Sequence, residues 1–496
     1  MIKSNISEWI IEKDIPSLQA VMEAGQISSE ELVQSYIERI RTFDPAINSV
    51  LELNPDAAAI ARELDQERAS HGSRGMLHGI PILLKDNIDT GDRMHTSAGS
   101  IALAESYASE DSAVSARLRA AGAVLLGKTN MTEWANFMSP TMWAGYSSRG
   151  GQTQNPYGSG DLFVGGSSSG SGAAIAANFA AAAIGTETMG SIISPSCQNF
   201  LVGIKPTVGL VGRSGIIPIT SSHDTAGPMA RTVTDAAIVL GAIAGEDLRD
   251  TATLHGIPFD QTEPTKLDSD FVRQAVIGIP RHYYQDLDAE RLEIVEEAIA
   301  TLRRLGATII DPVALTCERM DMGGDVLRYE FKKALNDYLS RLPEHVPVHS
   351  LRDVIAYNEA NAERALKYGQ DTLKWSEETS GTLTEPEYKA ALEQNDFARK
   401  SLDHALREHG LDALLFYGAE DGTDLAARAG YPVVTVPAGY AKTSARPWGQ
   451  VPTNGPQGIS FVGTAFSEPT LIQIAYGYEQ ATQHRFPPRL EADAKD

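Results

Sequence analysis

The feature that constrains this chain most is a repeated alternation between helical segments and short apolar runs. Residues 28–44 begin with a capping-box spacing and place their apolar side chains on one helical face. Helical segments expected near residues 56–70 and 112–121 precede the apolar runs that end at Leu84 and Leu126. Helices and strands that alternate in this way indicate a layered α/β fold.

The pattern changes in the middle of the chain and returns near its end. Residues 247–420 are dominated by long charged helices. The helix expected over 288–306 has core spacing at Leu292, Val295, Ile299 and Leu302. Two apolar strands, expected at 431–440 and 458–466, then precede a helix at 468–483. We therefore expect the last part of the chain to rejoin the α/β core.

The run GGSSSGSG at residues 165–172 has the composition of a flexible linker. It lies, however, directly before the alanine-rich segment 173–185, which we expect to form one helix packed on both sides. A linker joins two finished units, whereas this run enters a helix within a continuing α/β pattern. We therefore predict that it belongs to the core.

Charge and cysteine content exclude several classes of function. The net charge of −23 argues against a nucleic-acid partner, which needs a basic surface. Two cysteines, Cys197 and Cys317, supply neither a disulfide framework nor a metal-ligand spacing, so we expect no metal and no cofactor. The chain has no run of about 18 apolar residues and no signal-peptide pattern. We expect no membrane partner and a cytoplasmic location.

Two short motifs suggest competing functions. Residues 122–129, GAVLLGKT, match the P-loop pattern, but their middle residues are an apolar strand and not a glycine-rich loop, so we reject nucleotide binding. Residues 166–170 match G-x-S-x-G, the nucleophile elbow of α/β-hydrolases. That alternative makes Ser168 the nucleophile of a serine esterase with a histidine base, for which His223 and His255 are two candidates.

Three longer blocks occur in order: GIPILLKDN, VGGSSSGSGAA and GTETMGSIISP. Together with AGAVLLGKTNMTEWA, GQTQNPYG and YPVVTVPAGY they resemble the amidase signature family, whose members hydrolyse amide bonds with a Ser-Ser-Lys triad. The GTET form is similar to the bacterial branch of peptide amidases and broad-range amidases. The resemblance implies a three-layer α/β/α fold with a central mixed β-sheet flanked by helices.

Carried onto this sequence, the resemblance makes Ser191 the nucleophile, Ser167 a bridging serine reached through a cis peptide bond, and Lys85 the base. A serine hydroxyl is a weak nucleophile until a base removes its proton. A lysine can act as that base only when it is neutral, which requires burial to lower its pKa. Lys85 ends an apolar run, so burial is plausible; the structural alternative is a salt bridge to Asp86.

The same resemblance supplies the remaining site residues. The oxyanion hole falls on Thr188, Met189, Gly190 and Ser191. The family usually carries Asp or a small residue at the position of Met189, and often Arg at that of Ile193, so we expect a more apolar acyl pocket. The substrate-binding candidates are Gly165, Gly166, Met138, Phe200, Tyr368, Gln370 and Trp375.

We therefore expect one amidase domain over residues 1–496. Its parts are N-terminal helices (1–70), a catalytic core (71–246), a helix-rich cap over the active site (247–420) and a C-terminal return to the sheet (421–496). Expected substrates are peptide C-terminal amides, aryl amides or carbamates, with esters as a further option. The alternative to an enzyme that acts alone is an amidotransferase component that acts only in a complex. We expect a monomer or homodimer.

Overall fold

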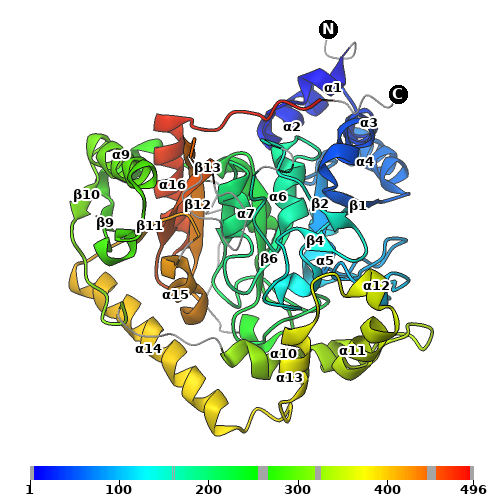
Figure 1. Cartoon of the computed structure of the whole chain (residues 1–496). Coiled ribbons are helices and arrows are strands. Elements are labelled where there is room, and N and C mark those ends of the chain that lie inside the picture. The colour runs from blue at the N-terminus through cyan, green and yellow to red at the C-terminus, as the bar shows by residue number, and fades with distance from the viewer. Residues whose placement is uncertain are drawn as a thin grey trace.

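An eleven-stranded mixed sheet forms the centre of the molecule in the computed structural model, which describes residues 5–158, 160, 162–254, 266–318, 325–419, 421–443 and 454–491. The strand order is β1-β3-β2-β6-β8-β7-β12-β13-β11-β9-β10. Figure 1 shows the sheet crossing the molecule, with helices on both of its faces. The strands are β1 Val50–Leu53, β2 Pro81–Lys85, β3 Val124–Thr129, β6 Ala182–Glu187, β7 Val202–Lys205, β8 Thr225–Ala230, β9 Val276–Gly278, β10 Thr308–Ile310, β11 Ala413–Tyr417, β12 Val433–Ala441 and β13 Gly455–Val462.

Parallel strands lie at the heart of the first half of this sheet. Strand β2 pairs in parallel with β3 on one side and with β6 on the other. Helix α5 (Ala113–Ala120) lies on the connection from β2 to β3, and α6 (Ser169–Ala176) lies on the connection from β3 to β6. These two connections move along the sheet in opposite directions, because β3 and β6 lie on opposite sides of β2. Because such crossovers are right-handed, α5 and α6 must cover opposite faces. The predicted α/β/α layering is confirmed.

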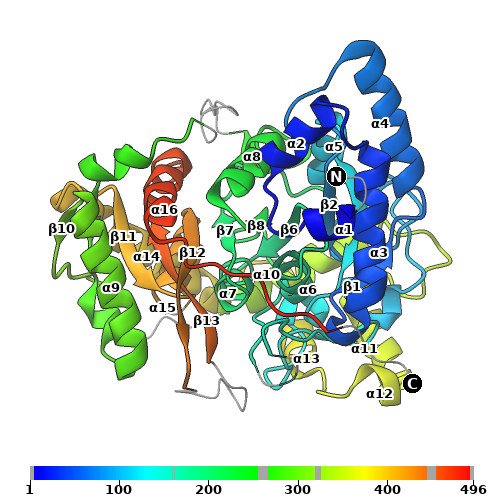
Figure 2. The ribbon, with the colours of Figure 1, turned by 90° about the horizontal axis from the view of Figure 1, so that it is seen from above.

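Helices α8 and α16 extend the layer of α5, and α7 extends the layer of α6 (Figure 2). Helices α8 and α16 contact each other and the sheet, and α6 and α7 also contact each other and the sheet. A two-stranded sheet pairs β4 Tyr146–Ser147 with β5 Gly151–Gln152. The helices not yet given are α1 Ile6–Trp9, α2 Ile15–Glu23, α3 Ser29–Ile47, α4 Ala57–His71, α7 Ile193–Gln198, α8 Val233–Ile243, α9 Ala289–Leu305, α10 Asp325–Leu339, α11 Leu351–Ala360, α12 Ala362–Ala365, α13 Asp371–Glu377, α14 Pro386–Glu408, α15 Asp421–Ala429 and α16 Glu468–Thr482.

The glycine- and serine-rich run 165–172 leads into α6 inside the core, as expected. A side chain at Gly170 would place its Cβ 2.3 Å from the carbonyl oxygen of Asn130, so only glycine fits there. Residues 122–129 form mainly strand β3, and Lys128 is buried with its Nζ donating to the carbonyl oxygen of Ile88 over 2.6 Å. Neither segment is a linker or a phosphate-binding loop.

One predicted helix proves to be two elements. The alanine-rich segment 173–185 begins as α6, but the helix ends at Ala176 and strand β6 begins at Ala182. Asn178 adopts a φ of 61° just after the end of the helix, the left-handed conformation that terminates many helices and that asparagine tolerates well. The prediction of a single helix was wrong because alanine packs equally well in a strand buried on both faces.

The middle of the chain contributes strands to the central sheet as well as helices. Residues 247–420 supply α9 to α14, and α10 to α14 run along the lower side of the molecule in Figure 1. The same region also supplies β9, β10 and β11, which extend the central sheet beyond β13. The expected cap therefore shares its region of sequence with one end of the sheet. Among the described residues, no helix is long and apolar enough to cross a membrane.

Helix α9 provides a test of the packing. Leu302 is fully buried, whereas Leu292, expected in the core, is 36% exposed. We predict that Leu302→Ala lowers the free energy of unfolding by about 2–5 kcal/mol, because it leaves a cavity. The matched change Leu292→Ala should cost no more than about 0.5 kcal/mol. Urea unfolding of both variants measures the difference, and equal losses would contradict this packing.

Candidate active site

Lys85 stands at the carboxyl end of β2 and is fully buried. Its Nζ donates to Ser167 Oγ over 2.8 Å, to the carbonyl oxygen of Thr186 over 3.1 Å and to Thr186 Oγ1 over 2.9 Å. Thr186 lies on β6, the parallel neighbour of β2, so the two strand ends bring these groups together. The structure thus joins two members of the predicted triad directly.

Burial favours the neutral form of this amine. It lowers the pKa of Lys85 to about 7, while the negative charges of Asp224 and Glu187 act in the opposite direction. The alternative partner Asp86 instead forms an ion pair with Arg149 over 3.1 Å and accepts a hydrogen bond from the backbone N–H of Gly99. The salt-bridge alternative for Lys85 is therefore wrong, and a large share of the molecules carry a neutral lysine near pH 7.

The contacts of Thr186 orient that neutral amine. A neutral amine has two N–H bonds and one lone pair, and the two oxygens of Thr186 can accept both N–H bonds. When both N–H bonds of the neutral amine go to Thr186, the lone pair faces Ser167 Oγ, so the hydrogen bond between them reverses and Ser167 becomes the donor, as a base for its proton requires. Asn87 Nδ2 donates to Thr186 Oγ1 over 3.0 Å and to the carbonyl oxygen of Ile217 over 3.3 Å, which holds this frame in place.

Sequence reasoning missed Thr186 and Asn87. The two residues lie inside the blocks GTETMGSIISP and GIPILLKDN, whose matched order was the available signal. The contacts of both side chains depend on the pairing of β2 with β6, which these sequence blocks do not reveal.

The two predicted serines lie on adjacent segments. The Gly166–Ser167 peptide bond is cis, as the resemblance implied. The backbone N–H of Ser168 donates to the carbonyl oxygen of Ser191 over 3.2 Å, which ties the segments together. Ser167 is fully buried and Ser191 is 7% exposed. Between these two described residues there is no hydroxyl–hydroxyl hydrogen bond, so proton transfer from Ser191 to Ser167 stays a prediction.

The predicted oxyanion loop presents unused donors. Within the described residues, the backbone N–H groups of Met189, Gly190 and Ser191 donate to no protein acceptor. The next two N–H groups, of Ile192 and Ile193, are both held by Glu187 Oε2, over 2.6 and 3.0 Å. The loop is thus anchored just after Ser191 while its own donors stay available.

The alternative nucleophile, Ser168, is already engaged. Ser168 is fully buried, and its Oγ donates to the carbonyl oxygen of Thr186 over 3.1 Å and accepts from the Thr186 N–H over 3.2 Å. His223 is buried beside Asn395, and burial lowers the pKa of its imidazole to about 3. His255 lies outside the described residues. These contacts argue against a Ser168–His223 pair.

A cavity of about 450 Å³ opens beside Ser191. Gly166, Thr188, Met189, Gly190 and Ser191 form one of its walls. Its other walls carry charged groups and the large apolar or aromatic side chains Phe137, Phe163, Leu287, Leu327 and Tyr417. Cys197 also borders it, but burial raises the pKa of this thiol to about 12, so the thiolate nucleophile is absent near neutral pH.

Two of the predicted substrate-binding residues, Gly165 and Gly166, lie directly before Ser167 in the chain. Gly166 lines the cavity. Gly165 has a φ of 74°, and a Cβ there would lie 2.5 Å from the Cα of Pro195, so glycine is required here for the close approach of the two segments; its contact with substrate stays a prediction.

The other five predicted substrate-binding residues lie outside the lining of this cavity, so their role in substrate binding stays a prediction. Met138 belongs to a buried apolar cluster, and Phe200 packs edge-on against Tyr157 and Phe486. Their neighbours already fill the space around each side chain.

The three cap residues among these five are likewise engaged within the protein. Tyr368 packs edge-on against Tyr146, and Gln370 Oε1 accepts a hydrogen bond from Asn358. Trp375 lies under the Arg328 guanidinium. Helix α10 contributes Leu327 to this cavity, but the role of region 247–420 as a cap over the active site stays a prediction.

Comparison with known proteins decides the family. A family model described as Amidase matches residues 31–472. The chain belongs to the amidase signature family. It is 40% identical to a probable amidase from Arabidopsis thaliana, over 97% of this chain and 92% of that protein. A crystal structure of native peptide amidase from Stenotrophomonas maltophilia is 43% identical, with a TM-score of 0.86 over 97% of this chain and 99% of that one.

A third relative has a different function. This relative, one of the subunits of glutamyl-tRNA(Gln) amidotransferase in Halorhodospira halophila, is 31% identical over 95% of this chain and 97% of that protein. The family membership makes this chain an amidase, a hydrolase acting on amides.

The buried lysine predicts a specific pH dependence of stability. The pKa of Lys85 is about 7 in the folded protein against 10.5 for the ordinary side chain, so between these values only the unfolded state binds the proton. Stability from this group is therefore present above pH 10.5 and lost as the pH falls to about 7. We predict that Lys85→Met is stabilised relative to wild type at pH 7, and that this advantage shrinks by about 1.4 kcal/mol per pH unit toward pH 10.

Chemical denaturation at several pH values measures this difference. The exposed Lys389 on α14 provides the control, since Lys389→Met should show a difference from wild type that does not change with pH. A pH-independent difference for Lys85→Met would show that this lysine is charged in the folded protein.

Proposed function

We propose that this amidase cleaves carboxamides through an acyl-enzyme intermediate on Ser191, with Ser167 as proton relay and Lys85 as base. The observation that carries the proposal is the 2.8 Å contact between Lys85 Nζ and Ser167 Oγ, combined with the two oxygens of Thr186 that accept the N–H bonds of the amine. This arrangement supplies a neutral, oriented base next to a hydroxyl, which serine catalysis needs.

The proposed steps balance. As Ser191 Oγ bonds to the substrate carbonyl carbon, its proton passes to Ser167, whose own proton passes to Lys85. The carbon–nitrogen bond then breaks, and a proton returns through Ser167 to the departing nitrogen. Water attacks the acyl enzyme by the same route and releases the carboxylic acid, which regenerates Ser191.

In this proposal, the loop from Met189 to Ser191 stabilises the negative charge of the tetrahedral intermediate. Its unused N–H groups border the same cavity as Ser191 and can donate to the oxygen that becomes negative. A preorganised donor of this kind lowers the barrier by about 3 kcal/mol. The side chain of Met189 leaves that backbone donor in place and adds apolar surface.

The cavity supports a hydrophobic acyl group. Phe137, Phe163 and Leu327 line it together with Met189, which supports an apolar acyl pocket, while Asp286, Asp288, Arg291 and Asp424 add charged groups to the lining. The likeness to a peptide amidase makes peptide C-terminal amides the first substrate class to test. Aryl amides, carbamates and esters proceed through the same tetrahedral chemistry and complete the panel.

The likeness to an amidotransferase component favours a second candidate, a chain that needs partners to act. Ammonia release from simple primary amides by the purified single chain separates the two. Turnover by the chain alone supports the hydrolase, and no turnover across the panel supports the complex-dependent component.

Substitution of two of the three proposed residues tests the triad. We predict that Ser191→Ala and Lys85→Ala each lower kcat by at least about a thousand-fold, because each removes a group that acts only with the others. Ser168→Ala is the matched control from the same run and should keep kcat within about ten-fold of wild type. Full loss in Ser168→Ala with activity retained in Ser191→Ala would restore the elbow alternative.

The rate should follow the ionisation of Lys85. Because the pKa of Lys85 is lowered to about 7 and the neutral amine is the base, we predict that kcat/KM falls about ten-fold per pH unit below pH 7. The matched control is Lys205, an equally buried lysine at the end of β7 whose pKa is lowered to about 8. Lys205→Met should keep the acid limb, and a flat profile down to pH 5 in wild type would contradict a lysine base.

A further inference from the structure

The helix that follows the proposed nucleophile carries further polar side chains into the same cavity. The backbone N–H of Ser194 donates to the carbonyl oxygen of Gly190 over 2.7 Å, so helical hydrogen bonding begins beside Ser191 and continues into α7. Ser191, Ser194 and Gln198 all line the cavity of about 450 Å³. Their spacing of three and then four positions places the three side chains on one face of this helix.

Gln198 has an amide group that the protein leaves unused. Its Oε1 is enclosed without a hydrogen-bond partner, and its Nε2 donates to no acceptor within the part of the chain that the structure describes. A polar group that is enclosed without a partner lowers stability. Because only the oxygen of this amide is enclosed, the nitrogen is the end that can reach a ligand in the cavity.

Two other side-chain amides border the cavity, and neither has this character. Gln457 accepts a hydrogen bond from the Tyr417 hydroxyl and donates through its Nε2 to a backbone carbonyl oxygen over 3.0 Å. Asn136 is exposed, so water can satisfy its amide. Gln198 therefore provides a neutral donor that a bound substrate can use.

The buried side chain of Asn155 fixes Gln198 beside an aromatic ring. Asn155 Nδ2 donates to the carbonyl oxygen of Gln198 over 2.8 Å and to that of Phe163 over 2.8 Å. Phe163 lines the same cavity and is 7% exposed. A donor and an apolar ring are thus held together by one amide, which reduces the entropy that a ligand must remove on binding.

Helix geometry sets how far this donor lies from the nucleophile. Gln198 follows Ser191 by seven residues, an axial distance of about 10 Å at about 1.5 Å per residue. Helical side chains lean toward the N-terminus, so the amide of Gln198 lies closer to Ser191 than its Cα does. Because an extended chain covers about 3.5 Å per residue, the amide lies beside the acyl chain one or two residues before the scissile carbonyl.

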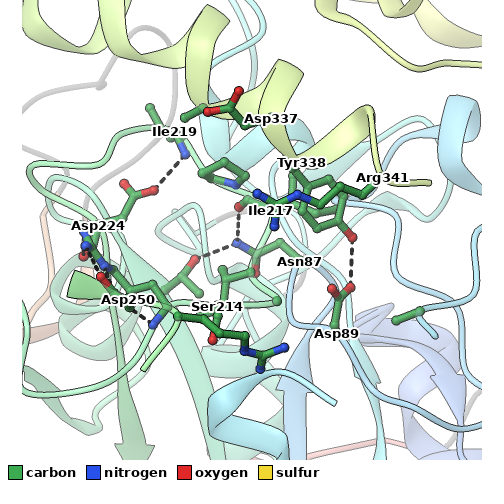
Figure 3. A pocket seen from close by; sticks show the side chains of 18 of the residues that line it. Asn87, Asp89, Ser214, Ile217, Ile219, Asp224, Asp250, Asp337, Tyr338 and Arg341 are labelled. Atoms are coloured by element: carbon green, nitrogen blue, oxygen red, sulfur yellow. Dashed lines mark hydrogen bonds and ion pairs between the residues drawn. The ribbon is translucent and has the colours of Figure 1, made fainter. Parts of the chain in front are cut away.

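The acyl chain belongs in the cavity beside Ser191. A neighbouring cavity of about 430 Å³, shown in Figure 3, is lined neither by Ser167 nor by Ser191. Thr188 and Ile219 border both cavities, and Asp224 fixes them by accepting from Thr188 Oγ1 over 2.6 Å and from the Ile219 N–H over 2.8 Å. We therefore expect a substrate bound at Ser191 to extend its acyl part along α7.

We propose that Gln198 Nε2 donates to the carbonyl oxygen of an N-acyl group on the substrate. The enzyme then prefers N-acylated amino-acid amides to simple carboxamides. This inference rests on the proposed acyl enzyme at Ser191. A carbonyl oxygen that enters the cavity loses its water, and the free N–H bond of Gln198 replaces it, while the apolar part of the substrate packs against Phe163.

The experiment compares N-acetylphenylalaninamide with 3-phenylpropanamide. Both have a phenyl ring and a primary amide, and only the first has the additional carbonyl. Wild type should cleave N-acetylphenylalaninamide with a kcat/KM about ten-fold higher. Gln198→Leu should lower that kcat/KM by about ten-fold and leave 3-phenylpropanamide within about two-fold, because only one of the two amides loses a hydrogen bond. Retained turnover of 3-phenylpropanamide also shows that the variant is folded.

Two further variants separate the donor from the shape of the side chain. Gln198→Glu has nearly the same shape but a carboxylate that cannot donate, so it should lose at least as much of the preference as Gln198→Leu. Cys197→Ala changes the adjacent residue of α7, which borders the same cavity, and should leave the ratio between the two amides unchanged. If 3-phenylpropanamide turns over too slowly, its inhibition constant against N-acetylphenylalaninamide provides the same comparison.

The outcomes distinguish this inference from the proposed function. A wild type that cleaves both amides equally well would overturn the inference. So would a Gln198→Leu variant that affects both amides alike or neither, or a Gln198→Glu variant that keeps the full preference. A wild type that cleaves neither amide would instead refute the proposed function.

Discussion

The hydrogen bonds around the Lys85 amine are the interaction on which the rest of the site depends. A buried amine is stable only where hydrogen-bond acceptors of the protein replace water, and here Ser167 and both oxygens of Thr186 do so. Two nearby carboxylates could have kept the amine charged, but each accepts hydrogen bonds from two backbone N–H groups, Glu187 at the start of α7 and Asp224 in the loop before β8. The same carboxylates therefore shape the loops and adjust the base.

The sheet makes this arrangement possible. Lys85 and Thr186 come from β2 and β6, parallel neighbours whose carboxyl ends open at the same edge of the sheet. Loops that follow such strand ends are the usual place for binding sites in open α/β sheets. The run 165–172 enters α6 close to that edge and delivers Ser167 to the amine, and glycine is required there because Asn130 and Pro195 approach the backbone closely.

Local sequence patterns predicted the features that depend on local chemistry. The apolar run ending at Lys85, the strand at 122–129 and the capping box of α3 all follow from short-range composition, and the structure contains them. The directions of single side chains did not follow. Phe137 rather than Met138 faces the cavity, and Leu292 faces outward, because contacts between distant segments decide those orientations. The role of Asp224 depends on loops that meet only in the folded chain.

The order of strands also bears on how the protein is made. Strand β7 has β8 on one side and β12 on the other, and β13 then connects β12 to β11. During synthesis, the edge of β7 that will receive β12 therefore has no partner until residues 433–462 leave the ribosome, and an open edge is a site for wrong association. A nascent chain that stops before Val433 already contains Lys85, Ser167 and Ser191, yet its sheet is still in two unconnected pieces.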